Sequence, residues 1–450
     1  MENTKNRSNF TGKIGFILAA AGSAVGLGNI WRFPYLAAQY GGGIFLLIYI
    51  ILAVTFGFAL MIAEIAIGRK TGLSCVGAFG KLRKKFAFIG WIEAAVPIIV
   101  LPYYSVIGGW VIKYFVSFFT GNSQAAAADT FFYDFMSSPA EPLLWFAVFM
   151  ILTAATVLMG VQKGVENISK ILMPVLVVLS LFIAVYTMFI PGAVDGIIYY
   201  IKPDFSRFSI NTVLAAMGQL FYSMSIAMGI MVTYGSYLKK DVNIESSVKH
   251  IEIFDTAVAF LAGLMIIPAV FACSDGNVGQ GPGLMFVTLP KVFETMKGGS
   301  VIGILFFLLV FFAALTSSVS MMETVVSIIM DKTGLKRKTI CVIVFAGAFL
   351  LGVPASLGNG VWNHINVIGM DFLTFFDFIS NSVIMPVVAL LICIFVGYVI
   401  KPSAIIEEID KTSPMKNKRM FTVIIKYFAP ICILLILVSS ILNAFGIITI

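Results

Sequence analysis

Residues 22–34 read GSAVGLGNIWRFP and residues 218–229 read GQLFYSMSIAMG, and each stretch interrupts a long apolar run with glycine and small polar residues. Such residues near the middle of a membrane span, in corresponding places of two halves, indicate discontinuous helices beside a binding site. A broken helix exposes backbone amides that suit a carboxylate and carbonyls that suit a cation. Gly22 and Gly26 also form a small-xxx-small packing motif, but two paired interruptions favour broken helices over packing alone.

The composition indicates that lipid is the main solvent of this chain. Of its 450 residues, 60% are hydrophobic and 12% are charged, whereas about a quarter of a soluble domain is charged. Apolar runs of about 20 residues cross the hydrocarbon core, and runs of this length satisfy their backbone groups as helices. We therefore expect an all-α polytopic membrane protein with about eleven transmembrane helices. The expected spans are 13–38, 43–69, 88–119, 142–160, 167–190, 211–238, 251–272, 300–330, 339–353, 372–399 and 422–447.

The basic residues predict the orientation. The net charge is +8, and nearly all Lys and Arg fall in alternate loops, while the loop at 121–141 contains acidic residues and no basic ones. Cytoplasmic loops of membrane proteins carry this excess of positive charge. We expect a cytoplasmic N-terminus, an outside C-terminus and no nucleic-acid partner.

Cysteine and histidine usage argues against metal or redox chemistry. The five cysteines are scattered without a CxxC pair, and the two histidines, His250 and His364, are far apart in sequence. This pattern provides neither a disulfide framework nor a zinc or haem site.

We expect no soluble domain. The predicted organisation is a cytoplasmic segment at 1–12, a first repeat of five spans at 13–190, an inverted second repeat at 211–399, and a further span at 422–447. The two interrupted spans would then open the two repeats.

Several motifs together resemble the neurotransmitter:sodium symporters, and in particular their bacterial amino-acid transporters. These are GSAVGLGNIWRFPY at 22–35, the glycines at 41–43, Tyr103-Tyr104, GQLFYSMSIAMG at 218–229 and Thr316-Ser317-Ser318. The resemblance covers essentially the whole chain. It implies a non-enzymatic symporter that takes up a neutral L-amino acid (hydrophobic, aromatic or small) with sodium by alternating access. It also implies a multi-pass protein of the bacterial cytoplasmic (inner) membrane, surrounded by lipid, as a monomer or loose dimer.

The resemblance further implies two sodium sites and an amino-acid site. The first sodium would bind the Ala24 carbonyl, Asn29, Ser223 and Asp255. The second would bind the carbonyls of Gly22, Val25 and Ala313 with the hydroxyls of Thr316 and Ser317, although such hydroxyls often only bond the carbonyl four residues earlier. The amino acid would contact Ala24, Leu27, Gly28, Val100, Tyr104, Tyr222, Ser223, Ser225, Met228, Ser317 and Met321.

Charged residues near the span ends would form the gates by the same resemblance. Arg32 and Asp377 would close the outer side, and Arg7 and Asp331 the inner side, with Phe10 as an apolar plug. Glu64 and Glu323 are candidates to brace the broken backbone, with the role of Glu323 left open.

Three residues depart from familiar members of the family. Ala227 replaces a glycine, which we expect to reshape the pocket or stiffen the break; Tyr222 replaces a phenylalanine; Asp255 replaces an asparagine. An ionisable group inside a membrane is a functional candidate by default. We expect Asp255 to supply the negative charge that bound chloride provides in chloride-dependent members, so that no chloride is required.

Three other classes of function remain open from the sequence. A channel is disfavoured because no TVGYG filter or Arg-rich sensor is present, and a membrane redox enzyme because ligands are lacking. A non-transporting amino-acid sensor would keep the same site, although no signalling domain accompanies it.

Overall fold

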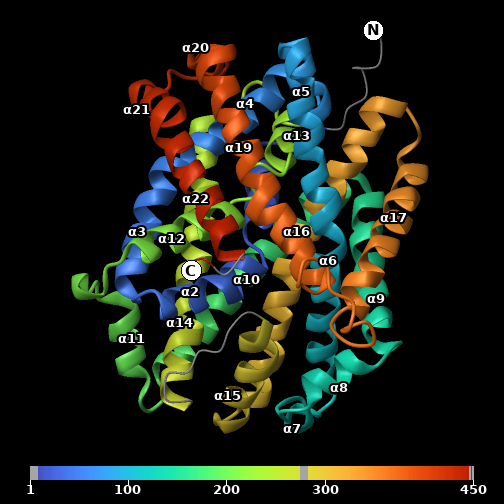
Figure 1. The fold of residues 1–450 in the computed structure, drawn as a ribbon, viewed down its shortest axis with the longest axis vertical. Helices are drawn as coiled ribbons and strands as arrows, with labels where there is room; N and C mark the ends of the chain where they lie inside the picture. The colour runs from blue at the N-terminus through green and yellow to red at the C-terminus, as the bar shows by residue number, and fades with distance from the viewer. Residues whose placement is uncertain (1–8, 274–281, 445–446, 448–450) are drawn as a thin grey trace.

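The computed structural model describes residues 9–273, 282–444 and 447. These residues are overwhelmingly helical and contain no β-sheet, only the isolated bridges Gly42–Pro203 and Val367–Met370. The expectation of an all-α polytopic membrane protein is thus confirmed. Figure 1 shows the helices crossing the molecule, with α5, α20 and α21 at one end and α7, α8 and α15 at the other.

The α-helices are α1 (Lys13–Ala24), α2 (Phe33–Gln39), α3 (Gly43–Leu52), α4 (Phe58–Thr71), α5 (Cys75–Leu82), α6 (Ala87–Phe119), α7 (Ser123–Ala126), α8 (Phe131–Ser137), α9 (Glu141–Leu158), α10 (Asn167–Met188), α11 (Ala193–Ile201), α12 (Ile210–Ser223), α13 (Ile230–Ser236), α14 (Ile244–Cys273), α15 (Leu289–Thr295), α16 (Gly299–Thr333), α17 (Arg337–Leu357), α18 (Phe372–Asp377), α19 (Met385–Ile394), α20 (Lys401–Asp410), α21 (Lys418–Val423) and α22 (Ala429–Ala444). Short π-helical or 3-10 segments join or extend them: η2 (Gly28–Arg32), η3 (Ala53–Gly57), η4 (Lys84–Phe86), η5 (Val161–Glu166), η6 (Phe205–Arg207), η7 (Leu284–Thr288), η8 (Phe378–Ile384), η9 (Phe395–Val399) and η10 (Ile424–Phe428).

The long apolar helices agree with the predicted spans. Within the described residues, 9 continuous helices are long and apolar enough to cross a membrane, and the pair Lys13–Ala24 and Gly28–Gln39, bent by 56° at its break, forms a tenth span. The remaining predicted span, at 211–238, corresponds to α12 and α13, which residues 224–229 separate. One predicted span was too short at its C-terminal end, because α17 continues through Pro354 to Leu357 instead of ending at residue 353.

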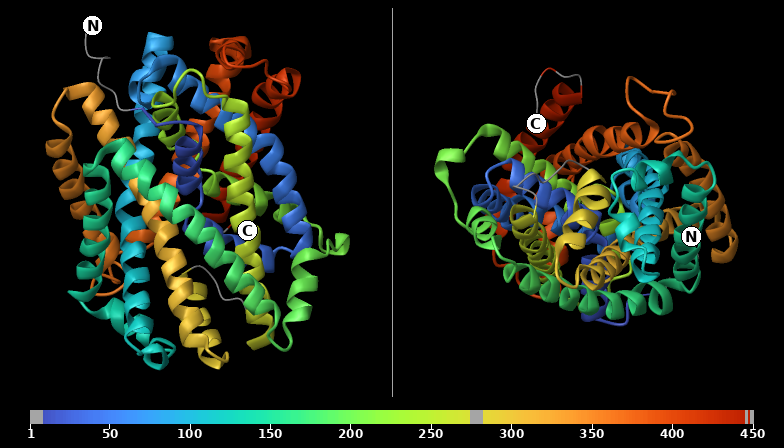
Figure 2. Two further views of the ribbon diagram at one scale, coloured as in Figure 1. Left: turned by 180° about the vertical axis from the view of Figure 1, so that it is seen from behind. Right: turned by 90° about the horizontal axis from the view of Figure 1, so that it is seen from below.

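The two interruptions lie at the predicted stretches. α1 ends at Ala24 because Val25 adopts an extended conformation (φ −72°, ψ 105°), and the helix resumes at Gly28. α12 ends at Ser223 and α13 starts after Gly229, whose φ is +70°. α1 packs against α10, α14 and α16, so its break lies inside the helical assembly. Figure 2 shows the same bundle from behind and from one end.

Close backbone contact between α4 and α13 holds the second break against the rest of the protein. A methyl group added at Gly68 would lie 1.9 Å from the Val232 carbonyl oxygen, and one at Gly235 would lie 2.3 Å from that of Ile65. Glycine is required at both positions because a larger residue would force the two helices apart.

We therefore expect Gly68→Ala to destabilise the protein by roughly 1–3 kcal/mol, the usual cost of overpacking a core. The melting temperature of the detergent-solubilised protein measures this. Gly347→Ala is the matched control, because Gly347 is exposed on α17 and has no atom within 4 Å of the added methyl. Equal melting temperatures for the two variants would contradict the packing described here.

Candidate binding site at the helix breaks

A small cavity of about 30 Å³ lies between the two breaks. Its wall is formed by the α1 break, the α12–α13 break, α6 and α16. It is lined by Ser23, Ala24, Gly26, Leu27, Gly28, Asn29, Val100, Tyr104, Tyr222, Ser225, Met228, Ile230, Ser317, Met321 and Asn381. Every residue predicted to contact the amino acid is among them except Ser223. Asn381, from η8, was not predicted, and no motif in the sequence pointed to it.

The backbone of the α1 break faces this cavity with its amide groups. The Leu27 amide donates a hydrogen bond of 3.2 Å to the Tyr104 hydroxyl oxygen, at the N-terminal end of η2. The N-terminus of a helix favours an anion because its amides are unpaired and its dipole is positive there. Gly28 must be glycine, since a methyl group would lie 2.4 Å from the Tyr222 ring.

A buried carboxylate lies next to the cavity. Asp255 is 1% exposed and accepts hydrogen bonds from the Asn29 amide (2.7 Å), the Ser223 hydroxyl (2.8 Å) and the Tyr49 hydroxyl (3.1 Å). Among the described residues, no Lys, Arg or His forms an ion pair with it. A buried carboxylate without a positive partner is costly, so the geometry fits a bound cation.

Two details of this cluster were not predicted. Ser223 turns its hydroxyl toward Asp255, which explains why it does not line the cavity. Tyr49, on α3, completes the set of neutral donors around the carboxylate. Its position in an apolar run gave no signal beyond the presence of one hydroxyl group.

A second cluster of oxygens joins the α1 break to α16. The Ser317 hydroxyl lies 3.3 Å from the Gly22 carbonyl oxygen and 3.2 Å from that of Val25. The Thr316 hydroxyl instead donates to the carbonyl oxygens of Phe312 and Ala313, at 3.0 and 3.1 Å. For Thr316 the ordinary intrahelical bond is thus present here, while Ser317 reaches the broken backbone.

Both clusters suit a hard monovalent cation. Their members are carbonyl, hydroxyl, amide and single carboxylate oxygens. Within the part of the chain that the structure describes, no group of three or more His, Cys, Asp or Glu residues could hold a metal ion. Oxygen-only ligand sets favour hard cations over transition metals.

The outer side holds a second, larger cavity, of about 360 Å³, whose wall includes both predicted outer-gate residues, Arg32 and Asp377. The Arg32 guanidinium lies over the Tyr222 ring, 5.0 Å from its centroid. Asp377 accepts hydrogen bonds from Tyr103 (3.2 Å) and Asn381 (2.7 Å). Arg32 and Asp377 are not within salt-bridge distance of each other in this conformation, and their closure of the outer side, directly or through water, stays a prediction.

The inner side is closed by aromatic packing. Phe10 is 1% exposed, and its ring contacts those of Phe16, Tyr234 and Tyr237. The predicted inner-gate residue Arg7 lies outside the described residues. Its expected partner Asp331 accepts hydrogen bonds from the Ser74 amide (2.9 Å) and hydroxyl (2.6 Å).

Two acids hold the α12–α13 break. Glu64 accepts a hydrogen bond of 2.7 Å from the Ala227 amide, which confirms its predicted role as a brace. Glu93, which was not singled out from the sequence, accepts one of 3.1 Å from the Gly229 amide. Its position as an acid within the apolar 88–119 span could have marked Glu93 as a functional candidate. Glu323 does not brace the break, because it pairs with Arg337 and accepts a bond from Tyr237.

Ala227 affects the backbone more directly than the cavity. Its φ is +61°, and that of Ser225 is +52°. The left-handed conformation costs a non-glycine residue roughly 1–2 kcal/mol in conformational free energy. The Ala227 side chain is buried but does not line the cavity, so its methyl group has no direct contact with the cavity.

Comparison with known proteins is consistent with this geometry. The family model described as the sodium:neurotransmitter symporter family matches residues 7–133 and 136–447. An uncharacterized sodium-dependent transporter of Bacillus subtilis, YhdH, is 36% identical over 436 residues, covering 95% of this chain and 96% of the relative. The sodium-dependent serotonin transporter of Drosophila melanogaster is 27% identical over 421 residues, covering 81% and 67%. The crystal structure of MhsT in complex with L-phenylalanine superposes with a TM-score of 0.88 at 38% identity, covering 97% of this chain and 100% of that one.

We expect Gly28→Ala to weaken ligand binding in the cavity by about tenfold or more, since the new methyl group overlaps Tyr222 and each 1.4 kcal/mol of strain costs tenfold. Gly218→Ala, on α12, is the matched control because its added methyl group meets no atom within 4 Å. Ligand-induced shifts in melting temperature measure the difference. Unchanged binding by Gly28→Ala would show that the ligand lies elsewhere.

Proposed function

Since this chain belongs to the sodium:neurotransmitter symporter family, we propose that it takes up a neutral L-amino acid together with sodium ions, by alternating access and without chloride. The observation that carries the proposal is Asp255, a buried carboxylate next to the cavity whose hydrogen-bond partners among the described residues are all neutral. A sodium ion there would be held by Asp255, Asn29, Ser223 and the Ala24 carbonyl, and by the substrate's own carboxylate.

The proposed substrate pose follows from the polarity of the break. The substrate carboxylate would accept hydrogen bonds from the Leu27 and Gly28 amides and from Tyr104. Its amine would lie near the carbonyl oxygens of Ala24 and Tyr222. Because one sodium would touch the carboxylate, each ligand raises the affinity for the other by the same factor.

The lining of the cavity supports a neutral substrate. None of the described residues that line it is Lys, Arg, Asp or Glu, so a charged side chain would be buried without a partner, which is strongly unfavourable. Met228 and Met321 provide adaptable apolar walls. The similarity to MhsT, whose structure contains L-phenylalanine, supports hydrophobic or aromatic amino acids.

A second sodium would bind where Ser317 meets the carbonyls of Gly22 and Val25, with Ala313 and Thr316 completing the set. Each entering sodium contributes about 2.3 kcal/mol per 100 mV of membrane potential, and about 1.4 kcal/mol for a tenfold gradient. Two ions therefore provide about 7 kcal/mol, enough for roughly 10⁵-fold accumulation of a neutral zwitterion.

The proposed orientation places the end with α5 and α20 in the cytoplasm of a bacterium, since Lys81, Lys84, Lys411 and Lys418 lie at or near that end. The N-terminus would then be cytoplasmic, and the acidic 121–141 loop would face outside. The open outer cavity and the aromatic closure around Phe10 support an outward-facing conformation. Arg32 and Asp377 would approach each other as the substrate is enclosed. We propose a monomer or loose dimer surrounded by lipid.

A screen of the twenty amino acids by melting temperature, in sodium and in potassium, tests the proposal directly. We expect neutral hydrophobic or aromatic amino acids to raise the melting temperature in sodium, and none to do so in potassium, because binding to the folded state stabilises it. Stabilisation by lysine or glutamate, or equal stabilisation in both salts, would contradict the proposal.

We further expect Asp255→Asn to lower amino-acid uptake into proteoliposomes by about tenfold or more in chloride-free buffer, because a charged ligand of the cation is lost. Asp195→Asn, at an exposed position on α11, is the control for the loss of one negative charge. Full chloride-free uptake by Asp255→Asn would show that this carboxylate neither binds sodium nor replaces chloride.

A further inference from the structure

Two buried carboxyl groups converge on the α12–α13 break. Glu64 of α4 and Glu93 of α6 are both 0% exposed. The Oε1 atom of Glu64 accepts the Ala227 amide, and the Oε1 atom of Glu93 accepts the Gly229 amide. The two acids therefore hold neighbouring amides of one short segment of backbone.

The second oxygen of each carboxyl group has no such partner. The Oε2 atoms of Glu64 and Glu93 are inaccessible to solvent and make no hydrogen bond with any described residue. A charged oxygen removed from water without a donor is strongly unfavourable, whereas a protonated carboxyl group loses this cost. The geometry therefore disfavours two ionised carboxylates.

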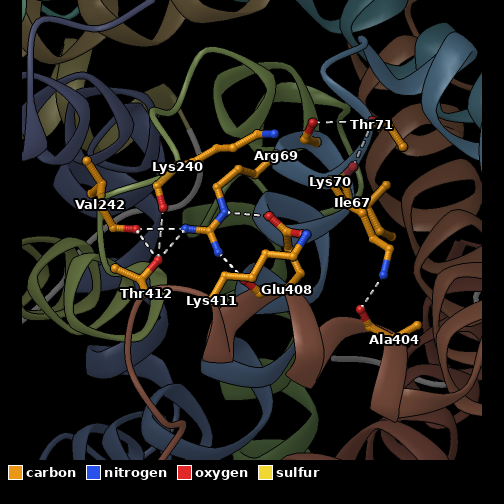
Figure 3. Close-up of polar contacts among 11 residues, drawn as sticks. Ile67, Arg69, Lys70, Thr71, Lys240, Val242, Ala404, Glu408, Lys411 and Thr412 are labelled. Atoms are coloured by element: carbon orange, nitrogen blue, oxygen red, sulfur yellow. Dashed lines mark hydrogen bonds and ion pairs between the residues drawn. The ribbon is translucent and has the colours of Figure 1, made fainter.

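Other buried acids of this protein show what an ionised carboxylate needs. Figure 3 shows Glu408 with Arg69, whose Nε lies 2.9 Å from the carboxylate and whose remaining nitrogens bond the Val242 and Glu408 carbonyls and Thr412. Lys411 contacts the same carboxylate at 2.6 Å. The buried acids with a basic partner are Glu166 with Lys170, Glu245 with Lys249, Glu323 with Arg337 and Glu408 with Arg69.

Glu64 and Glu93 have no basic partner among the described residues. Arg69 follows Glu64 by little more than one turn of α4, but its guanidinium is committed to Glu408 and α20. The other titratable groups that act on the pair are Cys75 of α5 and Cys393 of α19, and Asp331 of α16 acts on Cys75. All of these are neutral or acidic, so they add no positive charge.

Glu252 of α14 is the third buried acid with an unpartnered oxygen. Asp255 and Lys249, on the same helix, both act on it electrostatically, and it differs from the pair in having this basic neighbour. It also holds no amide of the broken backbone among the bonds found.

We propose that Glu64 and Glu93 form a proton-binding site in which one of the two carboxyl groups is protonated in this conformation. The two groups repel each other electrostatically, and two carboxylates that share a buried site cannot both ionise readily. A proton on an Oε2 atom leaves both Oε1 atoms free to accept the Ala227 and Gly229 amides. The site then carries a single negative charge.

This proton site is linked to the binding cavity through the backbone that it holds. Ser225 and Met228 line the cavity and belong to the segment 224–229. Loss of the proton would add a second negative charge, and the two carboxylates would repel each other beside the segment that they hold. Opening of the cytoplasmic side, which would admit water to the pair, is the step at which we place this loss. This proton site depends neither on the identity of the substrate nor on the proposed sodium sites.

Infrared spectroscopy of the wild-type protein in an ester-free detergent at pH 7 tests the proposal, because lipid ester carbonyls absorb in the same region as a protonated carboxylic acid. We expect the carbonyl stretching band of a buried protonated carboxylic acid, shifted in D₂O, and we expect its loss in both Glu64→Gln and Glu93→Gln. In either variant the glutamine acts as the neutral partner and the remaining acid is ionised. Absence of the band from the wild type, or an undiminished band in both variants, would overturn the proposal, and absence from the wild type decides even if a variant does not fold.

Melting temperature gives an independent readout with Glu408→Gln as the matched control. Glu408→Gln leaves Arg69 as a buried cation without its ion-pair partner, which is strongly destabilising. We therefore expect a clear drop in melting temperature. Glu93→Gln removes no ion pair and keeps an oxygen to accept the Gly229 amide, so we expect an unchanged or higher melting temperature. A drop as large as that of Glu408→Gln would show that Glu93 is ionised and stabilised by charge.

Discussion

The structure depends on one constraint: backbone groups freed by a helix break inside the membrane must find partners there. Gln219 donates to the Gly28 carbonyl at 2.8 Å, Ser317 reaches the Gly22 and Val25 carbonyls, and Tyr104 accepts the Leu27 amide. On the second break, Glu64 and Glu93 accept amides. The side chains around the breaks thus replace water, and a cation and an amino-acid headgroup can satisfy the same groups.

The two breaks are supported differently, and this difference bears on function. The α1 break relies on glycines that permit close approach, since added methyl groups at Gly26 and Gly28 would lie 2.8 Å from the Tyr104 hydroxyl and 2.4 Å from the Tyr222 ring. The α12–α13 break places the non-glycine residues Ser225 and Ala227 in the left-handed region, at an energetic cost. Hydrogen bonds from the Ala227 and Gly229 amides to Glu64 and Glu93 offset that cost. The charge on these two acids therefore affects the stability of the broken segment.

Much of the fold could be predicted from the sequence because hydropathy and glycine position act locally. Run length set the spans, and the motifs at 22–34 and 218–229 located both breaks. The cavity lining followed from the family resemblance, and the structure brings nearly all of those residues together. Long-range partners could not be predicted this way. Tyr49 on Asp255, Arg337 on Glu323 and Asn381 at the cavity depend on how distant helices pack, and the separation of Arg32 from Asp377 depends on the conformation.

The most direct measurement is an experimental structure determined with sodium and a bound hydrophobic amino acid. We expect the substrate carboxylate at the Leu27 and Gly28 amides, and a cation that joins this carboxylate to Asp255, Asn29 and Ser223. A carboxylate bound away from the α1 break, or an Asp255 neutralised by a basic side chain instead of a cation, would contradict this expectation.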